Sequence, residues 1–196
     1  EGIRALMRQD PDIIMVGEIR DQETLEIAMH AAMTGHLVLS TLHTNSAAAT
    51  LPRMLDMGAE PFLIASTVNV IIAQRLVRRL CVECRKEYKL EKKEIETLGK
   101  LFDIDEILTF LQNDAQTKKY LKDVKTWDDV SFYKAVGCDQ CGGEGYRGRQ
   151  GIYEVLEMDT DVRKLVTQAG TTEMIDAQAK KNGMATMVTD GFMKII

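Results

Sequence analysis

The sequence lacks the features that define several common classes of protein. No apolar run approaches the ~18 residues that a membrane-spanning helix needs, and the start EGIRALMRQD lacks the apolar core of a signal peptide. The 196 residues carry a net charge of −5 and only 6% aromatic side chains, whereas a nucleic-acid-binding surface needs a basic face or stacking rings. We therefore expect a cytoplasmic protein that does not bind nucleic acid.

A phosphate-binding loop of the form GxxxxGK[ST] is also absent, so the usual means of gripping a triphosphate is missing. Near the start, however, PDIIMVGEIRDQET places the apolar run Ile13–Val16 directly before Gly17 and Glu18. Such a run is typical of a strand buried on both faces in a parallel sheet. A carboxylate at its tip can orient water or hold Mg²⁺ beside a γ-phosphate, but it can equally be a solvated loop residue.

Both ends of the sequence have the pattern of interrupted helices. Ile3, Leu6 and Met7 recur at helical spacing at the start, and the end DGFMKII stops on two apolar residues without a closing cap. Only 17 residues precede Glu18. We therefore expect the chain to be a fragment whose missing part holds the phosphate-binding loop.

Residues 13–44 predict a β-α-β unit. Asp21 offers an N-cap and Gly35 a C-terminal stop for a helix with an apolar face at i, i+3, i+4 and i+7: Leu25, Ala28, Met29 and Ala32. The stretch HLVLSTLHT follows and predicts a second strand, parallel to the first. Ligands of parallel sheets bind beyond the carboxyl ends of the strands, where Glu18 and His43 are expected.

The remaining pattern is mainly helical. Residues 46–57 predict a helix that stops at Gly58, and Pro61 opens a third helix, which we expect to run through FLIASTVNVIIAQRLVRRL. A Lys/Glu-rich stretch over about 85–134 has apolar residues at helical intervals. After it, IYEVLEM predicts a short strand, followed by two short helices, the second from about Thr172 to Gly183.

Four cysteines form two CxxC pairs, Cys81 with Cys84 and Cys138 with Cys141. This spacing lets both thiolates of each pair reach one tetrahedral ion, and two such pairs in a reducing compartment favour structural Zn²⁺ over a redox or iron site. Because the protein would fill all four positions of the ion, the zinc would fold its module and not catalyse a reaction.

Histidines and arginines provide weaker signals. His36 begins and His43 ends the second predicted strand, and His43 shares a sheet edge with Glu18. His30 is interpreted as a helical i, i+4 partner of Glu26. The two arginines of GYRGR could meet a phosphate or a carboxylate of a partner, although solvated charges in a glycine-rich knuckle are the preferred interpretation.

Taken together, four motifs occur in one order: LMRQDPDIIMVGEIRD, TGHLVLSTLHTN, AQRLVRRLCVEC and GCDQCGGEGYRGRQGIYEVL. They closely resemble the C-terminal half of the secretion ATPases that power type II secretion and type IV pilus assembly. The resemblance implies an α/β fold with part of a RecA-like P-loop NTPase domain, whose substrate and cofactors are ATP, Mg²⁺ and Zn²⁺. It also implies a homo-hexamer at the cytoplasmic face of the inner membrane that acts on a membrane platform protein.

The resemblance assigns roles to individual residues. Glu18 matches the catalytic glutamate of a Walker B motif that Arg20 and Asp21 complete. His36 and His43 match the family's two histidines, thought to sense the γ-phosphate, and the four cysteines match its zinc site. Because pilus-retraction ATPases of the superfamily generally lack that zinc site, an assembly or export motor is favoured.

We expect three parts in the chain: half of the ATPase core over 1–80, a zinc-binding subdomain with a helical insertion over 81–145, and a mainly helical subdomain over 146–196. Without the phosphate-binding loop, the fragment alone should hydrolyse ATP negligibly. The alternative is a non-catalytic, zinc-organised protein-interaction module. The residues do not distinguish a secretion system from a pilus.

Overall fold

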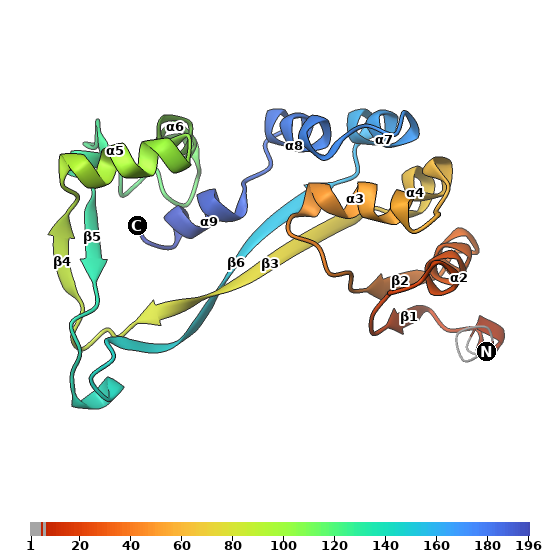
Figure 1. Cartoon of the computed structure of the whole chain (residues 1–196), viewed down its shortest axis with the longest axis horizontal. Helices are drawn as coiled ribbons and strands as arrows, with labels where there is room; N and C mark the ends of the chain where they lie inside the picture. Colours follow the sequence, from red (N-terminus) through yellow and green to blue (C-terminus); the bar gives the residue numbers. More distant parts are fainter. Residues whose placement is uncertain (1–4, 6) are drawn as a thin grey trace. The chain divides into compact units, whose positions relative to one another are not determined.

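The computed structural model describes residue 5 and residues 7–196, and its helices and strands form an α/β fold (Figure 1). The helical spacing expected at the start lies largely outside these residues, and a short 3-10 helix, η1 (Met7–Gln9), is seen there. Two compact units divide the chain: unit 1 takes residues up to Ala73 and Glu154–Met184, and unit 2 takes Gln74–Tyr153 and Ala185–Ile196. This division crosses the three ranges expected from the sequence, which remain a prediction.

Unit 1 contains the expected β-α-β arrangement. Strands β1 (Ile13–Val16) and β2 (Leu37–Ser40) are parallel neighbours, with Ile13 opposite Leu37, and α2 (Gln22–Met33) connects them. The expected burial of β1 on both faces is wrong. Ile14 and Val16 are buried, but Ile13 and Met15 are 58% and 74% exposed, because the described elements cover only one face of this strand pair.

Local signals set the ends of the helices in unit 1. The Asp21 side chain accepts from the backbone N–H of Thr24 and caps α2, and Ser46 caps α3 (Ala47–Asp56) in the same way through Ala49. Both predicted helices are therefore confirmed. Among the residues that the structure describes, this unit also contains α4 (Pro61–Thr67), α7 (Thr160–Thr167) and α8 (Thr172–Lys181). The last two confirm the two short helices expected late in the chain.

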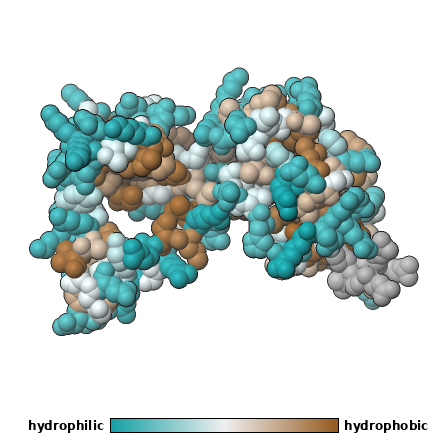
Figure 2. Space-filling model, viewed as in Figure 1, coloured by the Kyte–Doolittle hydropathy of each residue, from teal (hydrophilic) through white to brown (hydrophobic). Residues whose placement is uncertain are grey.

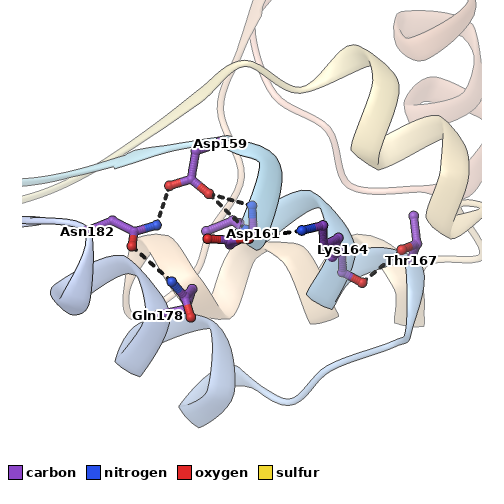
Figure 3. Close-up of polar contacts among 7 residues, drawn as sticks. Asp159, Asp161, Lys164, Thr167, Gln178 and Asn182 are labelled. Atoms are coloured by element: carbon purple, nitrogen blue, oxygen red, sulfur yellow. Dashed lines mark hydrogen bonds and ion pairs between the residues drawn. The ribbon is translucent and has the colours of Figure 1, made fainter.

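A polar network joins α7 to α8 (Figure 3). The Asp159 carboxylate accepts from the backbone N–H groups of Asp161 and Val162 at the start of α7, and also from the side-chain amide of Asn182 just after α8. Asn182 in turn accepts from Gln178 at 2.9 Å. One carboxylate thus caps one helix and fixes the end of the next, above an apolar core that includes Leu25, Leu51, Ile64, Leu156, Val162, Val166 and Ile175.

The third predicted helix is wrong beyond its first two turns. Helix α4 ends at Thr67, and the chain continues as the long strand β3 (Val70–Leu80). Val68 and the run from Val70 to Ile72 are β-branched, which favours extended backbone. The chain also supplies a partner strand far away in sequence, so that the backbone groups of β3 find hydrogen bonds that a helix would otherwise have provided.

That partner is β6 (Tyr146–Glu157), which is longer than the strand predicted from IYEVLEM. Near one end of the ribbon the backbone N–H of Met158 donates to the carbonyl of Asn69, and near the other the N–H of Cys81 donates to the carbonyl of Gly145. The two strands are therefore antiparallel. The division between the two units falls inside both strands.

Unit 2 has its own core. Strands β4 (Lys86–Lys89) and β5 (Ser131–Lys134) form an antiparallel pair that the sequence did not predict. The helical spacing of the Lys/Glu-rich stretch is confirmed by α5 (Lys92–Leu101) and α6 (Ile104–Asn113). The helical pattern expected at the end of the sequence is seen as α9 (Met187–Met193). Its Phe192 packs against Trp127 of the 3-10 helix η2 (Trp127–Asp129), with ring centroids 5.0 Å apart.

Across the described residues, no helix is both long and apolar enough to cross a membrane. Figure 2 shows apolar surface in several places on the face in view, bordered by hydrophilic side chains. Exposed large apolar residues include Ile13, Met15, Leu37 and Leu39 in unit 1 and Leu76, Val77, Val82 and Val136 in unit 2.

Candidate functional site

Two hydrogen bonds bring the ends of β1 and β2 together at one edge of the sheet. The Thr41 hydroxyl donates to the carbonyl of Gly17 at 2.7 Å, and the backbone N–H of Ile19 donates to the carbonyl of Thr41 at 3.0 Å. These bonds fasten the segment after β2 to the segment after β1. Glu18 and His43, one on each segment, are therefore neighbours as the parallel topology predicts.

Glu18 lies between two cationic or potentially cationic side chains. Its Oε2 is 2.7 Å from Nη2 of Arg20, and its Oε1 is 2.6 Å from Nε2 of His43. The Oε1 atom is itself buried and has no aligned hydrogen-bond donor among the described residues, although Nε2 of His43 lies close to it. The Glu18 side chain is 24% exposed, whereas those of Arg20 and His43 are 77% and 86% exposed.

This arrangement favours the ionised form of Glu18. The hydrogen bond from Arg20 is the main reason that the pKa of Glu18 lies below its ordinary value, and the charges of Arg20 and His43 act in the same direction against the partial desolvation of the carboxylate. The pKa of Arg20 is correspondingly raised by the hydrogen bond and charge of Glu18. The site therefore carries a largely shielded carboxylate in contact with two solvent-exposed partners.

The structure does not bring the other predicted site residues to this carboxylate. His36 precedes β2, at its amino end, and its Nδ1 lies 3.0 Å from both the Thr34 hydroxyl and the carbonyl of Ala31. Asp21 uses its two oxygens to accept from the backbone N–H and hydroxyl of Thr24, at 2.8 and 3.0 Å. These bonds lower the pKa of Asp21. In this arrangement, His36 and Asp21 both make contacts with residues close to them in sequence.

The described residues of this cluster do not form a Mg²⁺ site. Magnesium binds hard oxygen ligands, usually one or two carboxylates with water and substrate phosphates. One oxygen of Glu18 contacts the guanidinium of Arg20 and the other contacts the imidazole of His43, and both oxygens of Asp21 accept hydrogen bonds. In this arrangement, neither carboxylate has an oxygen without such a contact to offer to a magnesium ion.

The segment that carries His43 is also fastened on its other side. The Thr44 hydroxyl lies 2.9 Å from the hydroxyl of Thr50 and donates to the carbonyl of Ser46. At the first residue of α3, the backbone N–H of Ala47 donates to Oε1 of Glu154 at 2.7 Å. A carboxylate at this position also suits the positive end of the helix dipole.

Glu154 is a structural support that sequence reasoning missed. It is only 5% exposed. The alternation in IYEVLEM contains the signal, since Glu154 has the same parity as the buried Leu156 and Met158 and so shares their face of β6. A glutamate on the buried face of a strand indicates a specific partner inside the protein.

The four cysteines meet in unit 2. Their sulfur atoms lie within 4.8 Å of one another, with Cys81 to Cys138 and Cys84 to Cys141 each 3.9 Å apart and Cys138 to Cys141 3.8 Å apart. Four sulfurs bound to one zinc at ~2.3 Å lie ~3.8 Å apart in a tetrahedron. A disulfide would need ~2.05 Å. The arrangement therefore fits Zn²⁺ and excludes disulfides in this state.

The backbone around these sulfurs supports a metal-binding thiolate. The N–H groups of Cys138 and Gly145 donate to the Cys141 sulfur at 3.2 Å each, which lowers the pKa of Cys141 to about 6. Gly137 has φ +107, and an added Cβ there would lie 2.3 Å from the carbonyl oxygen of Gly143. The close approach of these two backbone segments therefore requires a glycine at 137.

The structure thus defines an α/β protein with an ion-paired carboxylate at the edge of parallel strands and a separate four-cysteine site. The family model for type II/IV secretion system proteins matches residues 1–196, and the chain belongs to this family. It is a homologue of the type IV pilus assembly and type II secretion ATPases.

Individual relatives support this assignment. The chain is 45% identical over 194 residues to the type IV pilus assembly ATPase PilB of Pseudomonas aeruginosa, covering 99% of this chain and 30% of that protein. It is 40% identical over 195 residues to type II secretion system protein E of the same species, covering 100% of this chain and 34% of that protein. The chain therefore spans about a third of the length of these relatives.

Among solved structures, the Legionella pneumophila ATPase DotB has a similar fold. The match has a TM-score of 0.55 and 23% sequence identity, and it covers 98% of this chain and 37% of DotB. At this level of identity the likeness concerns the fold alone. It agrees with the α/β arrangement expected from the sequence.

Proposed function

We propose that this chain is the part of a secretion or pilus-assembly ATPase that supplies the catalytic carboxylate and a structural zinc module. The observation that carries the proposal is the position of Glu18, held between Arg20 and His43 at the carboxyl edge of two parallel strands. Such an edge is where nucleotides bind in α/β proteins. The family relationship supplies the reaction, hydrolysis of ATP.

Glu18 suits the task of orienting the attacking water. Its lowered pKa keeps it ionised near neutral pH, so it can accept a hydrogen bond from the attacking water. That hydrogen bond orients the water so that a lone pair of the water oxygen points at the γ-phosphate. A carboxylate with a low pKa is a weak base, so we assign it positioning of the water and not full proton abstraction in the ground state. Arg20 fixes the carboxylate, and His43 contacts its other oxygen from the side open to solvent.

The rest of the nucleotide site lies in a longer polypeptide in this proposal. The relatives are about three times as long as this chain, and the sequence contains no GxxxxGK[ST]. We thus propose three features for the protein of full family length. It would contain a RecA-like P-loop domain, of which this chain is part, and a loop that binds the triphosphate with Mg²⁺. It would also assemble into a homo-hexamer. We place that protein at the inner face of the inner membrane, where it would move a platform protein. His36 would sense the nucleotide from the other end of β2, and Asp21 would complete the Walker B motif while capping α2.

The experiment is a measurement of phosphate release by this chain alone and by the chain extended upstream with its natural sequence to the length of its relatives. We expect negligible turnover by the chain alone and measurable turnover by the longer protein. Glu18→Gln should reduce that turnover by roughly 10²-fold or more, because the water loses the group that orients it. The control, Glu60→Gln, changes an exposed glutamate at the start of α4 and should leave turnover unchanged.

The alternative function is a zinc-organised interaction module without catalysis. A folded, zinc-loaded longer protein that releases no phosphate above blank would establish that alternative. Turnover by the chain alone that disappears in Glu18→Gln would contradict the need for an upstream loop.

A further inference from the structure

A pocket of about 360 Å³ lies beside the four-cysteine site in unit 2. Its lining consists of the end of β3, the first CxxC turn and the start of β6: Arg79, Leu80, Cys81, Val82, Glu83, Arg147 and Gly148. The metal site uses only one of these side chains, Cys81. The proposed nucleotide-site residues Glu18 and His43 lie in unit 1, so the pocket is separate from that site and shares only Cys81 with the metal site.

Two arginines in this lining lack counter-ions among the described residues. Arg79, near the end of β3, and Arg147, near the start of β6, line the same pocket. Both are exposed, and neither has a salt bridge or hydrogen bond within the part of the chain that the structure describes. Two like charges that line one pocket repel each other, and an anion bound between them would relieve this repulsion.

The neighbouring arginines are different. The guanidinium of Arg78 lies over the ring of Tyr146 at 4.0 Å, and that of Arg85 lies over the ring of Tyr133 at 4.4 Å. Those two side chains have a packing role within the chain. Arg79 and Arg147 therefore stand out as a pair available to an external group.

We propose that this pocket binds an acidic segment of a protein partner. A carboxylate of that segment would lie between the two guanidinium groups, each of which can present two N–H donors to it. Leu80 and Val82 in the same lining would contact an apolar side chain next to the acidic one, and Val82 is 62% exposed. Arginine is one of the residue types enriched at the positions that contribute most to binding in protein interfaces.

The lining favours a peptide over other anionic partners. Glu83 lies in the same pocket, where it would repel the uniform negative charge of a lipid surface or a nucleic-acid backbone. A peptide carries N–H groups that can donate to Glu83 while its carboxylate meets the arginines. A concave pocket also suits an inserted side chain better than a flat bilayer. Binding of this kind does not depend on ATP hydrolysis.

The test is selection of binders from a displayed library of random heptapeptides on the zinc-loaded chain. We expect enriched peptides to contain Asp or Glu beside an apolar residue. Arg79→Ser with Arg147→Ser should weaken binding of an enriched peptide at least tenfold in fluorescence anisotropy. Arg79→Lys with Arg147→Lys, which keeps the charge but loses the paired donors, should weaken it less.

A matched control removes the same charge elsewhere. Lys93→Ser with Lys118→Ser changes two exposed lysines outside the pocket and should leave affinity unchanged. Zinc content and circular dichroism identify any variant that is misfolded. If the Arg79→Ser, Arg147→Ser variant is misfolded, the Arg79→Lys, Arg147→Lys variant is compared with the wild type instead. The proposal is overturned if enriched peptides are not acidic, if they bind the Ser variant as well as the wild type, or if the arginines instead govern binding to phosphatidylglycerol vesicles.

Discussion

At the scale of single residues, the side chains nearest the proposed chemistry are held unequally. Glu18 is largely shielded, whereas Arg20 and His43 approach it from solvent and are 77% and 86% exposed. Exposed side chains of this kind change rotamer within nanoseconds. The carboxylate is thus the fixed element of the site, and its two partners can leave when a substrate group takes their place.

The lowered pKa of Glu18 makes one contribution to stability depend on pH. A carboxyl whose pKa is lower in the folded than in the unfolded state stabilises the fold above the unfolded value, ~4.3, and that contribution is lost as pH falls through the folded value. Urea unfolding of wild type and Glu18→Gln should therefore show a stability difference that shrinks as pH is lowered below ~4.3. A difference that grows in acid would contradict the ion-pair geometry.

At the scale of elements, local and non-local signals differ in what they determine. The caps Asp21 and Ser46 act within three residues, so the sequence predicted the starts of α2 and α3 correctly. The run after Thr67 is apolar, and its sequence is compatible with a helix or a strand. It forms a strand because it pairs with β6, which lies about 80 residues away in the sequence. Exposure of Ile13 could not be predicted either, because it depends on which face other elements cover.

The same contrast holds for the candidate sites. CxxC spacing predicted that four cysteines would meet, and parallel topology predicted that Glu18 would lie near His43. Glu154 was missed because its partner, the N–H of Ala47, is 107 residues away. The roles assigned to His36 and Asp21 remain predictions, since their contacts in this structure are local.

Glu154 allows a test of how α3 is held. In Glu154→Ala the buried N–H of Ala47 loses its acceptor, and the first turn of α3 loses a favourable charge. An unsatisfied buried donor costs about 1–3 kcal/mol, so we expect the free energy of unfolding in urea to fall by that amount. Glu157→Ala, at an exposed position of the same strand, should change it by less than ~0.5 kcal/mol. Equal effects of the two changes would show that the buried bond is not important.

At the scale of the whole molecule, two separate apolar cores stabilise the two units. One gathers residues of β1, α2, α3, α4, α7 and α8, and the other gathers the insertion with α9 around Trp127 and Phe192. The four cysteines belong to unit 2. None of them is part of either apolar core, the one that contains Leu51 or the one that contains Trp127. Metal binding and core packing are therefore distinct contributions to the fold.

Removal of zinc should have a local effect for this reason. A chelator is expected to raise amide hydrogen exchange most at residues 81–85 and 137–145, because structural zinc supplies the folding free energy of its own knuckles. Amides of α2 and α3 should keep their protection. Mass spectrometry of exchanged peptides measures this, with Cys84→Ser as the metal-free comparison and one bound zinc per wild-type chain as the reference. Loss of protection throughout unit 1 would contradict independent cores.

The insertion between the two CxxC pairs begins and ends at the same place, since Lys86 lies opposite Lys134 in the β4–β5 pair. Because its two ends are adjacent, the segment resembles a cassette that could be transferred to another protein. It is not self-sufficient, however, because Phe192 and its neighbours in α9 complete its core from the far end of the chain. A transplanted cassette would therefore have to carry α9 with it, and a deletion of the cassette would leave α9 with an uncovered apolar face.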